Sequence, residues 1–402
     1  MAGIFFWTGF DYRGEANPYG WPQVIAQNGI VDLCGFPKNP YYYLKSWWTD
    51  KPVLHIFPHW NWKGKEGQPI NVWVYSNCDE VELFLNGKSL GRKSMPKLSH
   101  IEWNVPYQPG ILMAQGYKNG KKIIAGKTET TGYPAVIRLI SDRTSIHADG
   151  EDMSVITVQV EDANGHTDLT ADNEISFHLQ GAGKIIGVGN GDPSSHEPDV
   201  FTDIIQIEKI NRLKMSFTRT KQNFQEVNYN FDDSEWTAFH QTNRVNSPQT
   251  DTLIIVRGLF NLPVIADNIK VTLFSKSICE NQSVYVNEYM LGKDILRGAP
   301  NQEFKLDDSI LKQGENIFSV IGTPFIKTQL YEDLNIDPGV VQVFIPAETW
   351  KRNAFNGLAQ IVVQSDQQPG KIKLTATSPG LKPAAIQLQA KAVPLRPAVP
   401  AK

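Results

Sequence analysis

Trp7, Asp11, Tyr12 and Glu15 lie close together near the start of the chain and have side chains suited to holding a sugar. The face of a Trp ring can stack on the apolar face of a sugar, while carboxylates and a phenol form hydrogen bonds with its hydroxyls. Residues 4–7 are a short apolar run of Ile, Phe and Trp, which predicts a buried strand directly before the loop. A buried strand that ends in Trp, a carboxylate and Tyr is expected at the C-terminal mouth of a (β/α)₈ barrel.

The two carboxylates admit a second interpretation. Asp11 and Glu15 could instead cap the loop and form ion pairs with basic residues such as Arg13 or Arg92. For Trp7, stacking on a sugar depends on an intact barrel around it. The sequence leaves both interpretations of the carboxylates open.

Composition narrows the class of protein. With 402 residues, 41% of them hydrophobic and 20% charged, the chain has room for about two to four domains with cores of their own. A net charge of −3 gives no electrostatic basis for binding nucleic acid or an anionic membrane. No apolar run approaches the roughly 20 residues that cross a bilayer, and the first residues lack the basic region of a secretory signal. We therefore expect no nucleic-acid partner and no membrane association.

Residue types that bind metals or phosphates do not gather into motifs. Cys34, Cys78 and Cys279 are far apart and odd in number, so they predict neither a disulfide framework nor a metal site. The histidines also lack metal-ligand spacing. The Gly-rich run 181–191 leads into β-forming residues rather than a helix, so it predicts tight turns and no phosphate cradle. We expect no metal and no cofactor.

Period-two alternation of apolar residues dominates the chain after residue 53 and predicts β-sandwiches. Residues 69–75 and 81–85 alternate in this way. Asn86-Gly87 follows directly and is the strongest short hairpin signal, because both turn positions tolerate positive φ. This pattern predicts a first sandwich that ends near residue 132.

A helix over residues 40–48 is predicted before this sandwich. Pro52 disfavours helix in the residue before it and so marks where the helix has ended. Trp47 and Trp48 lie on the predicted helix, and we expect both to pack in a core.

A second sandwich opens after residue 133, but its pattern stops at residue 193. Further strands follow only after residue 357. Four early strands plus three late ones give the usual seven, so we expect one domain split by an insertion. The predicted strands are residues 136–140, 154–161, 174–180 and 184–189, then 358–364, 371–377 and 384–390.

Residues 201–347 fill the split, and their strand pattern predicts an antiparallel jelly roll. Asp232, Asp233 and Glu235 could bind calcium or a sugar hydroxyl there, or could simply form a turn. The predicted strands of this insert include residues 253–262, 269–275, 283–287 and 314–320.

Blocks at the start of the chain resemble one enzyme family. They read WTGFDYRGE (residues 7–15), PYGWP (18–22), GIVDLCGFPK (29–38) and YYYLKSWW (41–48). In order and spacing they resemble the final barrel strand and helix of glycoside hydrolase family 2, β-galactosidase branch. The accessory immunoglobulin-like domains of this family are similar to residues 76–91, 187–198 and 354–378. The insert looks like the galactose-binding-like modules of many glycosidases.

The resemblance implies a retaining glycosidase with an acid/base Glu after barrel strand four and a nucleophilic Glu after strand seven. Both positions lie before residue 1, so no residue of this chain is assigned a catalytic role. Trp7, Asp11, Tyr12 and Glu15 are assigned to substrate binding. The implied partner is a β-galactoside-like carbohydrate in the complete enzyme, and the oligomeric state stays open. A periplasmic or extracellular location is implied only if the complete family member carries a signal upstream.

The expected fold is mainly β: tandem immunoglobulin-like β-sandwiches with a jelly-roll insert, preceded by a truncated (β/α)₈-barrel remnant. The expected function is that of the C-terminal part of a β-galactosidase-like retaining glycoside hydrolase, inactive alone. The alternative is a non-catalytic carbohydrate-binding or scaffold protein acting through the jelly roll. The expected parts are a barrel remnant (1–50), a first sandwich (51–132), two halves of a second (133–200 and 348–392), the jelly roll (201–347) and a disordered tail (393–402).

Overall fold

The computed structural model describes residues 3, 5–219, 223–239, 252–262, 268–296, 299–300, 302–324 and 337–395. The chain forms two compact units. Unit 1 is Met1–Phe201 together with Thr349–Lys402, and unit 2 is Thr202–Glu348. Both consist mostly of antiparallel sheet, so the predicted mainly β fold class is confirmed.

The first sandwich of unit 1 has two sheets, in the orders β3-β4-β7 and β6-β5-β8-β9. Every second residue of β4 from Ile70 to Ser76 is buried, as its alternation predicts. At Asn86 and Gly87 φ is 49° and 83°, the two positive values that a two-residue hairpin needs, so the predicted turn is confirmed. The strands are β3 (Leu54–Phe57), β4 (Pro69–Ser76), β5 (Glu80–Leu85), β6 (Lys88–Ser94), β7 (Ile101–Pro106), β8 (Ile111–Lys118) and β9 (Lys121–Glu129).

The N-terminal segment departs from the predicted strand. Residues 5–7 pair with no strand in the described part of the chain, Phe5 is fully exposed, and Ile4 lies outside the described residues. Pairing begins later, where residues 8–11 run alongside residues 28–31. The prediction of a buried strand is therefore wrong for residues 5–7, because β propensity needs neighbouring strands to cover the side chains. The short strands here are β1 (Tyr12–Arg13) and β2 (Ile25–Ala26).

The predicted helix is confirmed as α1 (Asn39–Trp48). Pro40 lies in its first turn, where a missing N–H breaks no intrahelical hydrogen bond. Trp47 is half-buried, but Trp48 is 69% exposed, so the expectation that both pack in a core is wrong for Trp48. Successive helical residues point about 100° apart, and only one face of α1 meets β3 and β4.

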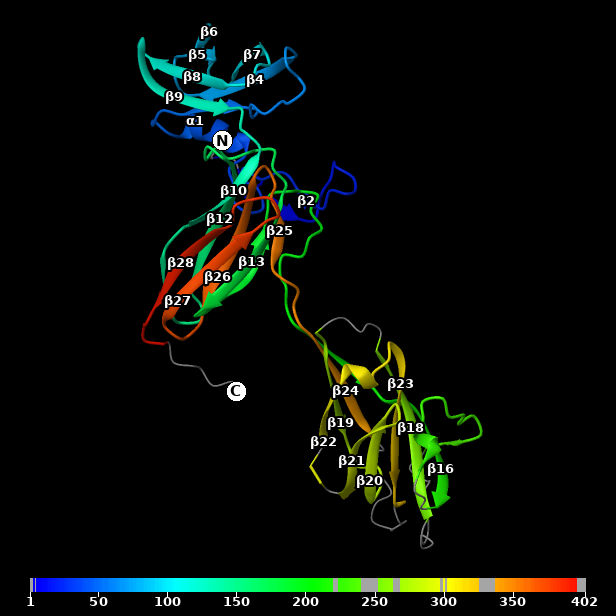
Figure 1. The fold of residues 1–402 in the computed structure, drawn as a ribbon. Coiled ribbons are helices and arrows are strands. Elements are labelled where there is room, and N and C mark those ends of the chain that lie inside the picture. The colour runs from blue at the N-terminus through cyan, green and yellow to red at the C-terminus, as the bar shows by residue number, and fades with distance from the viewer. Residues whose placement is uncertain are drawn as a thin grey trace. The chain divides into compact units, whose positions relative to one another are not determined.

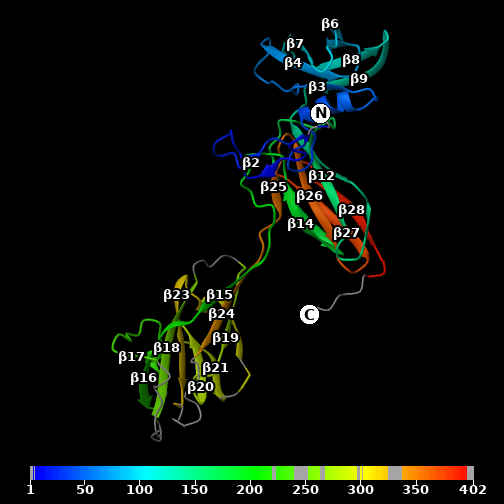
Figure 2. The ribbon, with the colours of Figure 1, turned by 180° about the vertical axis from the view of Figure 1, so that it is seen from behind.

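The second sandwich of unit 1 combines strands from both sides of the unit 2 sequence. Its sheets have the orders β10-β12-β26-β14 and β11-β28-β27-β13-β25. Figures 1 and 2 show the orange β26 beside the green strands that come some 200 positions earlier in the chain. The sheets contain nine strands rather than the predicted seven, because β11 and β25 have three residues each, too few to show alternation. The strands are β10 (Pro134–Ser141), β11 (Ser145–His147), β12 (Met153–Asp162), β13 (Glu174–Gly181), β14 (Gly183–Gly189), β25 (Lys351–Asn353), β26 (Leu358–Ser365), β27 (Gly370–Thr377) and β28 (Ala384–Lys391).

Unit 2 is a sandwich of sheets β15-β24-β19-β22 and β17-β16-β18-β23-β20-β21. Phe260, Leu273, Phe318 and Val341 are buried in a core shared by the two sheets. The elements are β15 (Ile204–Lys209), β16 (Asn211–Arg219), η1 (Gln225–Val227), β17 (Thr237–Ala238), β18 (Thr252–Leu262), β19 (Lys270–Ser275), β20 (Asn281–Val286), β21 (Tyr289–Leu296), β22 (Gln302–Leu306), η2 (Asp308–Ile310), β23 (Gly314–Gly322) and β24 (Gly339–Ile345).

The acidic residues at the start of the insert have structural partners. Asp233 pairs with the buried Arg257 at 2.9 Å and with Lys214 at 3.1 Å. Asp232 accepts a hydrogen bond from Ser234 N at 2.9 Å. Of the alternatives for this group, turn formation and ion pairing therefore describe both Asp side chains.

None of the described helices is long and apolar enough to cross a membrane. Within the predicted tail, residues 396–402 lie outside the described part of the chain.

Candidate functional site

Three of the four predicted sugar-binding residues lie together in the N-terminal loop. Trp7 Nε1 donates a hydrogen bond to the Tyr12 hydroxyl at 3.3 Å, and the Tyr12 hydroxyl donates to Glu15 Oε2. The bond to Glu15 raises the pKa of Tyr12, so the phenol stays protonated and keeps its place between its two neighbours. The Trp7 indole is 70% exposed. The group thus presents an aromatic face beside a carboxylate.

A turn brings Glu15 back toward Tyr12. Gly14 and Glu15 have φ values of 91° and 48°, both in the left-handed region. Gly14 N donates to Val24 O at 2.9 Å, so the turn is held by a neighbouring segment. A left-handed residue other than Gly is uncommon, and here it places a carboxylate next to a phenol.

Asp11, the fourth predicted residue, lies apart from this group. It is 6% exposed and accepts hydrogen bonds from Gly29 N at 2.8 Å and from Lys38 Nζ at 2.8 Å and 3.0 Å. The backbones come so close here that a Cβ on Gly29 would lie 2.2 Å from Asp11 N. Asp11 therefore anchors the loop, and its ion-pair partner is Lys38 rather than Arg13.

Arg13 instead reaches the second sandwich, where it pairs with Asp199. Asp199 also accepts from Arg352 Nη2 at 2.5 Å, and Arg352 is 1% exposed. The same guanidinium donates to the carbonyls of Val188 and Pro198 at 3.2 Å and 3.1 Å. A buried Arg therefore holds the carboxylate that holds the candidate sugar loop.

A second contact fixes the same loop. His196 lies against Trp21, with the ring centres 4.4 Å apart, and its Nε2 is 3.0 Å from Pro22 O. Val24 N donates to Pro193 O at 3.1 Å. These bonds join the N-terminal segment to the loop that follows β14.

Sequence reasoning missed the residues that support the loop. Lys38, Asp199 and Arg352 carry no motif that links them, because they are distant in sequence and meet only in the folded chain. The sequence holds two partial signals: Lys38 ends the block at residues 29–38, and the block at residues 187–198 stops directly before Asp199.

The chemistry of the site is that of a hydrogen-bond acceptor beside an aromatic surface. Residues 5–38 contain two cations, Arg13 and Lys38, and both are engaged by carboxylates. The Asp11 carboxylate is buried and already bonded to Gly29 and Lys38, so Glu15 is the exposed carboxylate among the four predicted residues. This arrangement suits a neutral, hydroxyl-rich ligand.

Comparison with known proteins adds family matches. Residues 137–205 and 336–387 match the profile of glycoside hydrolase family 2 C-terminal domain 5. Residues 67–124 match a domain of unknown function, DUF4982.

Among curated proteins, the β-galactosidase BoGH2A of Bacteroides ovatus is 50% identical over 200 residues, covering 49% of this chain and 23% of that protein. A putative β-glucuronidase of Formosa agariphila is 39% identical over 198 residues, covering 48% of this chain and 19% of that protein. The matched region thus spans about a fifth of the length of these two relatives.

A solved β-glycosidase from Bacteroides vulgatus has the same fold, with a TM-score of 0.55 and 23% identity over 95% of this chain and 30% of that one. A family 2 glycosyl hydrolase from Bacteroides cellulosilyticus also has a TM-score of 0.55 and 23% identity, over 96% of this chain and 35% of that one. The profile and the curated relatives identify this chain as similar to the C-terminal region of glycoside hydrolase family 2 proteins. The solved structures share its fold.

Proposed function

We propose that the chain is the C-terminal part of a β-galactosidase-like retaining glycoside hydrolase and that its N-terminal loop forms one wall of the sugar site. The observation that carries this proposal is the hydrogen-bonded group of Trp7, Tyr12 and Glu15 on an anchored loop. An exposed indole beside a carboxylate matches the two needs of sugar recognition, a stacking surface and a hydroxyl acceptor. The names of the curated relatives, β-galactosidase and β-glucuronidase, support a glycoside as substrate.

A neutral sugar fits the loop better than a uronic acid. A carboxylate on the sugar would need a cation, and Arg13 and Lys38 are already paired with Asp199 and Asp11. Glu15 adds a negative charge at the exposed edge and would repel an acidic sugar. The loop therefore favours a galactoside-like substrate over a glucuronide.

The chain alone is expected to be inactive. Retaining hydrolysis needs two carboxyl groups about 5 Å apart, one as acid and base and one as nucleophile. The described loop offers Glu15 and no second exposed carboxylate beside it, since Asp11 is buried on Lys38. Purified chain should not hydrolyse an aryl β-galactoside, and turnover that Glu15→Gln abolished would contradict this.

The direct test joins the chain to a barrel. A chimera would carry the preceding region of the Bacteroides ovatus β-galactosidase, which is 50% identical in the matched part. We expect hydrolysis of aryl β-galactosides, with kcat/KM lowered roughly tenfold by Trp7→Ala, because loss of stacking costs about 1 kcal/mol or more. Trp48→Ala removes a Trp of equal exposure on α1 and should leave kcat/KM unchanged. Equal effects of the two substitutions would refute the placement of Trp7 at the sugar.

The alternative role, sugar binding by unit 2 alone, has weaker support. Two of the three acidic candidates there have protein partners: Asp233 pairs with Arg257 and Lys214, and Asp232 accepts from Ser234 N. Two results together would favour this alternative: isolated unit 2 binds the sugar, and Trp7→Ala leaves the kcat/KM of the chimera unchanged.

A further inference from the structure

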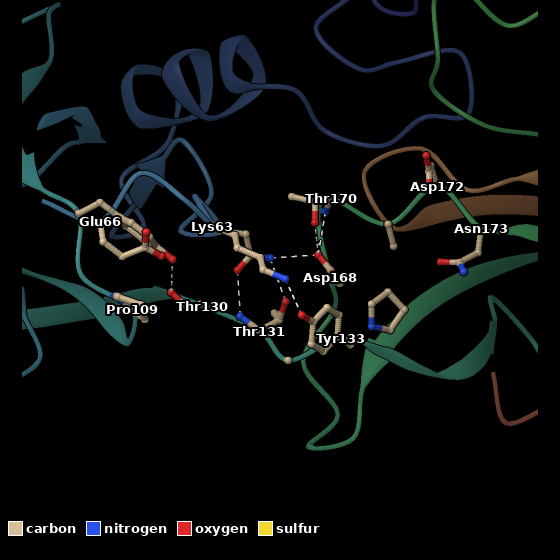
Figure 3. Close-up of a pocket in the computed structure, with 15 residues that line it drawn as sticks. Lys63, Glu66, Pro109, Thr130, Thr131, Tyr133, Asp168, Thr170, Asp172 and Asn173 are labelled. Atoms are coloured by element: carbon tan, nitrogen blue, oxygen red, sulfur yellow. Dashed lines mark hydrogen bonds between the residues drawn. The ribbon is translucent and has the colours of Figure 1, made fainter. Parts of the chain in front are cut away.

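A cavity of about 460 Å³ lies within unit 1, where its two sandwiches meet. Figure 3 shows its walls: Lys63 and Glu66 come from the first sandwich, Tyr133 from the connection, and Asp168 and Asp172 from the second sandwich. The volume falls in the range of about 300–1,000 Å³ that is usual for small-molecule sites. None of the lining residues belongs to the N-terminal loop.

Hydrogen bonds fix the two walls relative to each other. Asn61 Nδ2 donates to Thr131 Oγ1 at 2.9 Å and to Asp168 Oδ1 at 3.0 Å. Thr131 N donates back to Asn61 Oδ1 at 2.9 Å. Asn61 therefore ties the first sandwich to the connection and to the second sandwich. The cavity is preformed, which lowers the entropic cost of filling it.

One wall contains a buried carboxylate with an unused oxygen. Asp168 is 5% exposed, and its Oδ1 accepts from Asn61 and from both N and Oγ1 of Thr170 at 2.7–3.0 Å. Its Oδ2 has no hydrogen-bond partner among the residues that the structure describes. This oxygen is therefore open to a hydrogen bond from a hydroxyl of a ligand in the cavity.

Further acceptors surround this oxygen. Asp172 is exposed and has no side-chain partner within the described ranges, and Glu66 accepts only from Gly64 N, at 3.2 Å. Together with Asp168 they give three carboxylates in the lining against one cation, Lys63. Lys63 is engaged with Tyr133, donating to its hydroxyl and lying 4.5 Å from the ring centre. The lining therefore attracts hydrogen-bond donors and repels anions.

The remaining requirement for a sugar is an apolar surface. Tyr133 is 77% exposed and lines the cavity, together with Pro109 and Pro134. Aromatic faces bind the C–H face of a sugar ring, while carboxylates accept from its hydroxyls. We propose that this cavity is a binding site for a neutral saccharide, with Tyr133 as the stacking surface and Asp168, Asp172 and Glu66 as hydroxyl acceptors.

The test measures binding of neutral disaccharides to the whole chain by titration calorimetry and saturation-transfer NMR. Lactose, cellobiose and xylobiose are the neutral probes, and glucuronic acid is the anionic probe. We expect at least one disaccharide to bind at millimolar concentration and glucuronic acid to bind more weakly. Tyr133→Ala and Asp172→Ala change exposed residues that need not disturb folding, and each should weaken binding by about tenfold or more.

A matched variant separates this site from other exposed aromatic surfaces. Tyr289→Ala removes a 50% exposed Tyr from unit 2 and should keep wild-type affinity for the disaccharide. The proposal is overturned if no neutral disaccharide binds, if glucuronic acid binds more tightly, or if Tyr133→Ala and Tyr289→Ala have equal effects. The last result would mean that the cavity is not where the disaccharide binds.

Discussion

Cutting the chain after residue 348 should unfold the second sandwich and leave the other two sandwiches intact. The cut removes β25 to β28, of which β26 is hydrogen-bonded between β12 and β14, and β27 between β28 and β13. Both sheets therefore lose strands from their interior rather than from an edge. The two strands next to each gap would then lie too far apart to pair with each other.

The size of the effect follows from the side chains that leave. Five large aliphatic residues of these strands are at most 1% exposed: Ile361, Val363, Ile372, Leu374 and Leu388. At about 1.5–3 kcal/mol each, their burial contributes roughly 7–15 kcal/mol. A whole domain is stable by only about 5–15 kcal/mol, so the remaining half cannot stay folded. The core of unit 2 uses no residue beyond 345 and should be unaffected.

A matched deletion removes unit 2 instead. Phe201 and Trp350 flank unit 2 and are in ring contact, 5.4 Å apart, so a short Gly/Ser linker can replace residues 202–348. This deletion should keep the second sandwich folded. Hydrogen exchange of β12 amides measures both outcomes: protection should vanish in the truncated chain and persist in the deletion variant. Persistent β12 protection after truncation would show that β26 is not its essential partner and would refute the reasoning.

Three further changes have defined outcomes. Lys38→Met leaves the Asp11 carboxylate buried without its cation and should destabilise the N-terminal segment by about 3–5 kcal/mol. Hydrogen exchange should then be faster at the amides of this segment. Adding Asp11→Asn should restore part of their protection. Gly87→Ala should cost about 1–2 kcal/mol in urea unfolding, because φ is +83° and no atom lies nearby, whereas Gly20→Ala, also in open space but without positive φ, should be neutral. Burial lowers the pKa of His55 to about 4, so the unfolded chain, with a pKa of about 6.5, takes up the proton first as pH falls. Stability should therefore drop by about 2 kcal/mol between pH 8 and pH 5, and His55→Gln should flatten this part of the profile; an unchanged slope would contradict the assignment.

The sequence by itself determined the elements that depend only on a few consecutive residues. Alternation in β4 predicts its buried face, and Asn86-Gly87 predicts the hairpin, because each depends on a few consecutive residues. The hairpin between β20 and β21 has the same two positive φ values at Asn287 and Glu288, 45° and 73°. It carries no Asn-Gly signal, so its turn could not be predicted with the same force.

Only the tertiary structure decided what each carboxylate of the N-terminal loop does. Asp11 and Glu15 are equivalent candidates in the sequence, yet one is buried on Lys38 and the other is exposed beside Tyr12. The partners of Asp11 lie 18 and 27 positions away, at Gly29 and Lys38, and the loop is also held through Arg13 by Asp199 and Arg352. Burial and ion pairing depend on contacts between segments distant in sequence. The period of the apolar residues and the β propensity of each segment contain no information about those contacts. The motif therefore marks the candidate site, and the fold decides which of its carboxylates is buried and which is exposed.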